Sequence, residues 1–162
     1  MNFKKNEYTK LITYILSNSY TKPYVGKTVI TTTLYFIDFN YYEAYGKSLT
    51  NESYYKTKKG IKPAHFNKTT EELINTKKLY LRKENYYGST LHKYYLAKIP
   101  NIRFKKNKLN IINTTIKLLL NKNATNILRY ASKDTPVKKT KLNQEISYKY
   151  AKTRTPKYSI LN

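Results

Sequence analysis

The chain has 162 residues, which is enough for one domain with a hydrophobic core. Its 32 lysine and arginine residues against 9 acidic ones give a formal charge of +23, so we expect an anionic partner, with nucleic acid as the first candidate. The absence of cysteine excludes a disulfide framework and a thiolate zinc site, and the 2 histidines are too few for a metal site, so we predict no metal and no cofactor.

The first part of the chain predicts a hairpin after a short leading element. Residues 8–16 fit either a helix or a strand. Residues 27–37 are rich in β-branched and aromatic side chains and predict the clearest strand of the chain. Residues 38–40 then predict a turn, and residues 41–45 a second strand that ends at Gly46.

Residues 55–63 form a lysine-dense stretch that contains no acidic residue. Its cations cannot neutralise one another, so only an external polyanion can balance them. Gly60 permits close approach of the backbone to a ligand, and Pro63 fixes φ where the stretch enters the next element. We therefore predict a phosphate-binding loop.

Residues 69–72, with the sequence TTEE, fit a capping box and predict a helix from about residue 70 into the low eighties. Glu71 and Glu72 are interpreted as partners of the helix dipole, not as a catalytic pair. Residues 84–99 contain several tyrosines without a clear period and are interpreted as an insertion.

The next elements alternate in type. Residues 101–105 alternate polar and apolar side chains, as a half-buried strand does. A helix is expected to begin at Asn113 or Thr114 and to stop at Asn123, which would adopt a left-handed conformation there. Residues 126–130 are expected to return as a strand.

This order of elements predicts an α/β fold, a layered domain with a mixed sheet and right-handed crossovers. We expect an N-terminal extension at residues 1–24, an α/β RNA-binding domain at residues 25–137, and a basic C-terminal tail at residues 138–162. The tail has little apolar content, so it should become ordered only on RNA.

Several segments occur in an order that points to a known family. They are residues 26–31 (GKTVIT), the basic loop with Tyr55, Lys56, Lys59 and Pro63, residues 116–119 (IKLL) and residues 134–137 (DTPV). Together they resemble the universal small-subunit ribosomal protein eleven family over about residues 25–137. The chain is similar to a divergent mitochondrial member of that family.

This resemblance implies a three-layer ribonuclease H-like fold and a structural role on the platform of the small mitochondrial ribosomal subunit. The implied partners are the small-subunit rRNA and neighbouring ribosomal proteins, and the implied location is the mitochondrial matrix, whether the gene is organellar or nuclear. The apolar runs are too short to span a bilayer, and we expect no secretory signal at the N-terminus, because residues 1–7 are not followed by an uninterrupted apolar segment.

The candidate RNA-binding residues are the cations of the basic loops and tail, which would contact phosphates, and tyrosines on which unpaired bases could stack. They are Lys27, Lys56, Lys58, Lys59, Lys62, Lys105, Lys106, Lys108, Lys138, Lys139, Lys141, Lys149, Lys152, Arg154, Lys157, Tyr55, Tyr148 and Tyr150. No catalytic residue is predicted, because the chain is expected not to be an enzyme.

Three alternatives remain open. A metal-dependent nuclease would need convergent carboxylates, and Asp38, Glu43 and Asp134 are few and scattered along the chain. Residues 150–154 (YAKTR) resemble the end of the small-subunit ribosomal protein nineteen family, which would place the chain in the head of the subunit. A free-standing single-strand binder is the third alternative, although no aromatic platform is evident.

Overall fold

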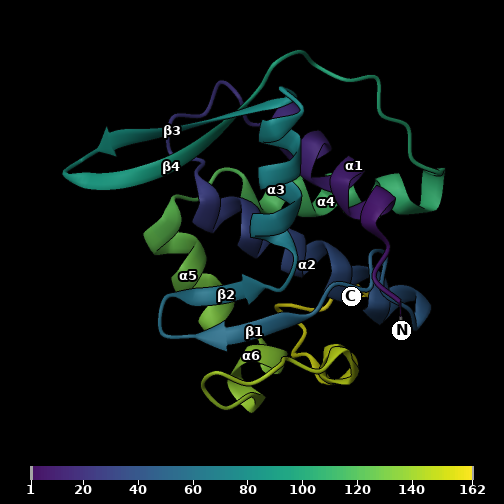
Figure 1. Cartoon of the computed structure of the whole chain (residues 1–162). Coiled ribbons are helices and arrows are strands. Elements are labelled where there is room, and N and C mark those ends of the chain that lie inside the picture. The colour runs from purple at the N-terminus through teal and green to yellow at the C-terminus, as the bar shows by residue number, and fades with distance from the viewer. Residues whose placement is uncertain (1, 162) are drawn as a thin grey trace.

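The computed structural model describes residues 2–161, and Figure 1 shows them as a mostly helical body with two small hairpins. In chain order the elements are α1 (Lys5–Ser17), α2 (Lys27–Tyr45), β1 (Tyr54–Thr57), β2 (Gly60–Pro63), α3 (Phe66–Asn75), β3 (Leu79–Tyr86), β4 (Ser89–Leu96), α4 (Lys106–Leu119), α5 (Ala124–Ser132), α6 (Thr135–Lys139) and the 3-10 helix η1 (Tyr148–Thr153).

The predicted α/β fold with a three-layer mixed sheet is wrong. Within residues 2–161 the strands form two separate antiparallel pairs, β1 with β2 and β3 with β4. The hairpin register pairs Tyr54 with Pro63 in the first and Leu79 with Leu96 in the second. No parallel pairing exists among these described residues, so no crossover layer can form.

Helix α2 is the centre of the molecule, and it replaces the strands predicted at residues 27–37 and 41–45. Every residue from 29 to 41 is buried, and the helix contacts α1, α4, α5, η1 and both hairpins. A helix buried on all sides has no polar face, so its 3.6-residue period cannot be seen in the sequence. Burial here outweighs the weak preference of β-branched side chains for strands.

The threonines of α2 satisfy their hydroxyl groups within the helix. The hydroxyls of Thr32 and Thr33 each donate at 2.7 Å to the backbone carbonyl four residues earlier, at Thr28 and Val29. A buried hydroxyl without a partner would destabilise the helix, so these bonds allow a threonine run in the core. Gly46 ends the helix in a left-handed conformation with φ 69°, as a C-terminal glycine commonly does.

The stretch predicted to be a phosphate-binding loop is the β1–β2 hairpin. Its free edge is covered by the C-terminal segment. The Lys56 N–H donates to the Gln144 carbonyl at 3.0 Å, the Asn143 N–H donates to the Lys56 carbonyl at 2.6 Å, and the Ile146 N–H donates to the Tyr54 carbonyl at 2.7 Å. The outer edge of β1 is therefore paired with the C-terminal segment.

Helix α3 begins four residues earlier than the capping box predicts, with His65 as N-cap and no side-chain cap. Glu72 instead forms an ion pair with Lys5 of α1, with Nζ and Oε2 2.5 Å apart. The helix ends at Asn75, and the expected insertion at residues 84–99 belongs to the long β3–β4 hairpin.

The second half contains more helix than the sequence analysis expects. Residues 101–105 form no strand, and α4 begins directly after them at Lys106. Asn123 has φ −80° and starts α5 as its N-cap, with its side chain accepting the Asn126 N–H at 2.9 Å. The predicted strand at residues 126–130 therefore lies inside α5. An asparagine between two helices can end the first one in a left-handed conformation or cap the N-terminus of the second. Asn123 does the latter.

The C-terminal segment is packed on the body and is not a trailing arm. Ile146, Ala151 and Tyr158 are buried in the same hydrophobic core as α2. Figure 1 shows this segment beside α6, beneath the β1–β2 hairpin. Among the described residues, none of the helices has the length and apolar character that crossing a bilayer requires.

Candidate functional site

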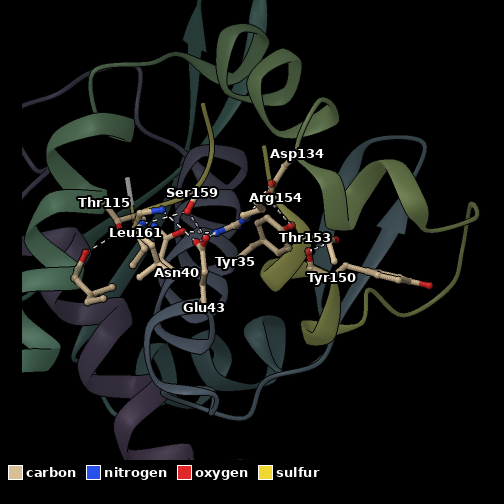
Figure 2. A network of polar contacts seen from close by, with 12 residues as sticks. Tyr35, Asn40, Glu43, Thr115, Asp134, Tyr150, Thr153, Arg154, Ser159 and Leu161 are labelled. Carbon is tan, nitrogen blue, oxygen red and sulfur yellow. Dashed lines mark hydrogen bonds and ion pairs between the residues drawn. The ribbon is translucent and has the colours of Figure 1, made fainter. Parts of the chain in front are cut away.

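A buried arginine organises the polar interior. Arg154 follows η1, and its side chain has no exposed surface. Its Nε and Nη2 donate to the two oxygens of Asp134 at 2.9 and 2.7 Å, which is the bidentate geometry of strong charged pairs. The Tyr35 hydroxyl of α2 donates to the same carboxylate at 2.8 Å. Figure 2 shows this group, which joins the C-terminal segment to α2 and the start of α6.

The other side of Arg154 contacts polar groups of α2. Its Nη1 donates to the Asn40 Oδ1 at 2.6 Å and lies 3.3 Å from the Glu43 Oε2. Asn40 in turn donates to the Thr115 hydroxyl of α4 at 2.9 Å. Glu43 also accepts from the Ser159 hydroxyl at 2.5 Å. The network therefore holds four separate parts of the chain together around one guanidinium (Figure 2).

This network is structural and offers no catalytic chemistry. Burial alone would lower the pKa of Arg154, but Asp134, Tyr35 and Glu43 outweigh that effect and raise it. The guanidinium stays charged and pairs with Glu43 and Asp134, which are two of the three carboxylates that the nuclease alternative would need. No group of three or more possible metal ligands occurs within residues 2–161.

The third of those carboxylates, Asp38, is also used inside the fold. One of its oxygens accepts from the Ser48 hydroxyl and the Thr50 N–H at 2.8 and 2.9 Å, and the other accepts from the Thr50 and Tyr54 hydroxyls at 2.5 and 2.7 Å. Burial raises the pKa of Asp38 above its ordinary value of 3.8, although these hydrogen bonds oppose the shift. Asp38 therefore fastens the loop after α2 and strand β1 to the central helix.

The strongest candidate for a binding site is an open cleft of about 850 Å³, a volume typical of ligand sites. It lies between β2 and the tip of the β3–β4 hairpin, and the first turns of α2, α3 and α5 line it. Threonines of α2 contribute to its lining, and none of the lining residues is acidic. We call this feature the interhairpin cleft.

The interhairpin cleft is cationic. Lys27, Lys59 and Lys62 line it, and none of them has an acidic partner within residues 2–161. Lys27 is partly buried, and its Nζ donates to the Asn67 Oδ1 at 2.7 Å. Burial lowers the pKa of Lys27, and the charge of Lys62 lowers it further. The cleft therefore concentrates positive charge that the fold itself does not balance.

The helix starts add to this positive potential. Helices α2 and α3 begin at the cleft without a side-chain cap on their first N–H groups. The partial positive charge of a helix N-terminus acts over about one turn. The first turns of these helices therefore reinforce the field of the lysines.

The β3–β4 hairpin projects from the body (Figure 1), and residues at its tip line the cleft. Its outer strand β3 exposes 54% of Tyr80 and 41% of Leu81, and Tyr87 at the tip is 92% exposed. Arg82 on the same strand lies 5.6 Å from the Tyr95 ring, where it forms a cation–π contact. Tyr80 and Arg82 lie on one face of β3 and Leu81 on the other, because successive side chains of a strand alternate. Exposed tyrosine and arginine are enriched at protein interfaces.

The residues predicted to bind RNA lie in different environments, and only Lys27, Lys59 and Lys62 come together in the cleft. Other members of that set make internal contacts. Lys56 donates to the Val137 and Thr140 carbonyls at 3.1 and 3.0 Å, Lys108 pairs with Glu7 at 3.1 Å, Arg154 is buried, and the Tyr148 hydroxyl donates to the Glu52 carbonyl at 2.5 Å.

The remaining members lie elsewhere on the surface. Tyr55 and Tyr150 are half-buried, and the exposed lysines are Lys58, Lys105, Lys106, Lys138, Lys139, Lys141, Lys149, Lys152 and Lys157. Contact of any of these side chains with an anion stays a prediction.

The sequence analysis missed most of the cleft. It did not single out Thr28, Thr31 and Thr32 of α2, nor His92 and Tyr86 of the second hairpin, all of which line it. The threonine run was taken as a strand, and the hairpin as an insertion. The only signal available was the clustering of tyrosines around a glycine at residues 86–88, which fits a hairpin turn.

No curated protein and no solved structure matches the chain significantly. Residues 32–154 match the model of a protein family described as "Antitoxin SocA-like, Panacea domain". The match begins in α2 and ends at Arg154, so it includes Tyr35, Asp134 and Arg154 together. It also includes the cleft lining apart from Tyr24 and the start of α2.

Proposed function

We propose that this chain acts as an antitoxin, because it belongs to the SocA-like antitoxin family with the Panacea domain. The match over residues 32–154 is the observation on which this proposal rests. As a component of a toxin–antitoxin system, the chain would bind a toxin protein and suppress its activity through that contact.

The resemblance to the ribosomal protein eleven family was wrong, and so were the ribosomal function and the rRNA and ribosomal-protein partners inferred from it. The family match and the helical fold overturn them. The alternatives of a nineteen-type ribosomal protein and of a nuclease fall for the same reasons. The short lysine-rich and Thr-Pro segments that suggested the ribosome reflect a basic composition more than a shared fold.

The prediction that the chain is not an enzyme is confirmed, since antitoxins are typically non-enzymatic. The mitochondrial location stays a prediction.

The geometry supports a protein partner. Tyr87 offers an exposed aromatic ring in the lining of the cationic cleft, and Tyr80 and Leu81 are exposed farther along the same hairpin. Interfaces between proteins commonly combine such an apolar centre with charged surroundings that speed association. The excess of cations over the whole chain would favour a toxin with an acidic surface.

The proposal is tested by growth rescue in a bacterial host. The open reading frame beside this chain's gene is induced alone and then together with the chain. We expect growth arrest in the first case, restored growth in the second, and copurification of both proteins at equal stoichiometry.

The control is a chain that ends at residue 31. It lacks the family domain of residues 32–154 and should not rescue growth. A toxic neighbour that this chain neither rescues nor binds would contradict the antitoxin function.

A further inference from the structure

The interhairpin cleft has a property that the antitoxin function alone does not explain, which is its one-sided charge. Lys59 and Lys62 are exposed at its rim, and Lys27 lies deeper and partly buried. Like charges brought together in this way repel one another, and a fold tolerates this where an anion is to be bound. The cleft is therefore suited to an anionic ligand.

The surroundings of the cleft distinguish a protein anion from a nucleic acid. Tyr87 lines the cleft at the hairpin tip, and Tyr80 and Leu81 are exposed farther along β3, on opposite faces of the strand because successive side chains alternate. A polynucleotide offers phosphates and stacked bases, to which an exposed leucine contributes little. An acidic protein segment next to an apolar patch would use both the lysines and the hairpin.

The three lysines also suit carboxylates. Each lysine is a compact point charge with rotatable donors and can pair with a separate carboxylate. The open shape admits an extended segment between the two hairpins.

We propose that the interhairpin cleft binds an aspartate- or glutamate-rich segment of the toxin, while the β3–β4 hairpin contacts the adjoining apolar surface of the same protein. This proposal rests on the proposed antitoxin function and identifies the surface that performs it. Lys27, Lys59 and Lys62 are the residues that select an acidic partner.

The first test uses a labelled hexaglutamate peptide, with hexaglutamine as its neutral counterpart, and the full chain. Hexaglutamate should bind and hexaglutamine should not. Lys59→Glu/Lys62→Glu should weaken hexaglutamate binding at least about tenfold, because each reversal replaces an attraction with a repulsion.

The matched control is Lys106→Glu/Lys117→Glu, which reverses two exposed lysines of α4 away from the cleft and changes the net charge equally. This double variant should change the affinity for hexaglutamate by less than about twofold, because salt screens the interaction between exposed charges that lie far apart. Equal losses in the two double variants would overturn the cleft as the binding site. Displacement of the peptide by a lower concentration of single-stranded RNA of equal charge would overturn the choice of a protein ligand.

The second test separates this proposal from the antitoxin function. If the wild-type chain rescues growth and Lys59→Glu/Lys62→Glu does not, although it is folded by circular dichroism, the proposal is supported. Full rescue by that variant overturns the cleft and leaves the antitoxin function standing. Failure of the wild-type chain to rescue overturns the antitoxin function itself.

Discussion

Replacing Arg154 by methionine tests whether the buried arginine network holds the C-terminal segment on the body. The substitution keeps much of the apolar stem and removes the charge that neutralises Asp134 and Glu43. Both carboxylates are almost completely buried, so they would be left without a cation in a poorly polar interior.

Removing one partner of a buried ion pair typically costs about 3–5 kcal/mol. Domains of this kind have a total stability of about 5–15 kcal/mol, so the variant should lose a large part of it. For a chain of this length the melting temperature should fall by roughly 6–20 °C.

The assay is urea unfolding followed by circular dichroism, with Lys149→Met as the matched control, because Lys149 is an exposed cation in the same segment. The control should lie within about 0.5 kcal/mol of the wild type. Adding Asp134→Asn to Arg154→Met should restore part of the loss, since the stranded charge is then removed as well. A cost for Arg154→Met no larger than that of the control would refute the reasoning.

Two further predictions concern the backbone of the first hairpin and the buried acid of α2. Gly60→Ala should destabilise the chain by more than Gly88→Ala does. Both glycines have positive φ, but a Cβ at Gly60 would clash with the Leu128 Cδ2, whereas nothing lies within 4 Å of one at Gly88. Equal costs in urea unfolding would contradict the steric argument. Burial raises the pKa of Asp38 in the folded state, so just above pH 3.8 the folded state binds more protons than the unfolded state does. The contribution of Asp38 to the free energy of unfolding therefore falls as the pH rises above 3.8. The stability of the wild type relative to Asp38→Asn should fall in the same direction between pH 4 and 7, and a flat or rising difference would contradict the shift.

Some features follow from local chemistry and were predicted correctly. Gly46 was expected to end a strand, and although that element is the helix α2, the chain does stop there, because glycine adopts a left-handed conformation without strain. A helix was expected after Asn113 or Thr114, and the residues that follow do lie in α4, with Ile116 and Leu119 buried. In each case the signal is a single residue type or a short period, which no distant contact needs to supply.

Other features depend on contacts between distant parts of the chain. The run at residues 27–37 has the composition of a strand, yet it forms the central helix because other elements bury it on every side. Asp134 and Arg154 are separated by 20 residues, and both lie far in sequence from Tyr35. Nothing in the sequence around Asp134 or Arg154 indicates that these two charges are buried and paired with each other.

By itself, then, the sequence determined that the chain is strongly basic, lacks cysteine chemistry and has a run of lysines without acidic residues at residues 55–63, since these are properties of composition and neighbouring residues. Only the tertiary structure decided that α2 is a helix, that the C-terminal segment is part of the core, and that Lys27, Lys59 and Lys62 share one cleft. The physical reason is that burial and charge pairing are free energies of groups distant along the chain, and these outweigh the fractions of a kcal/mol by which local preferences differ.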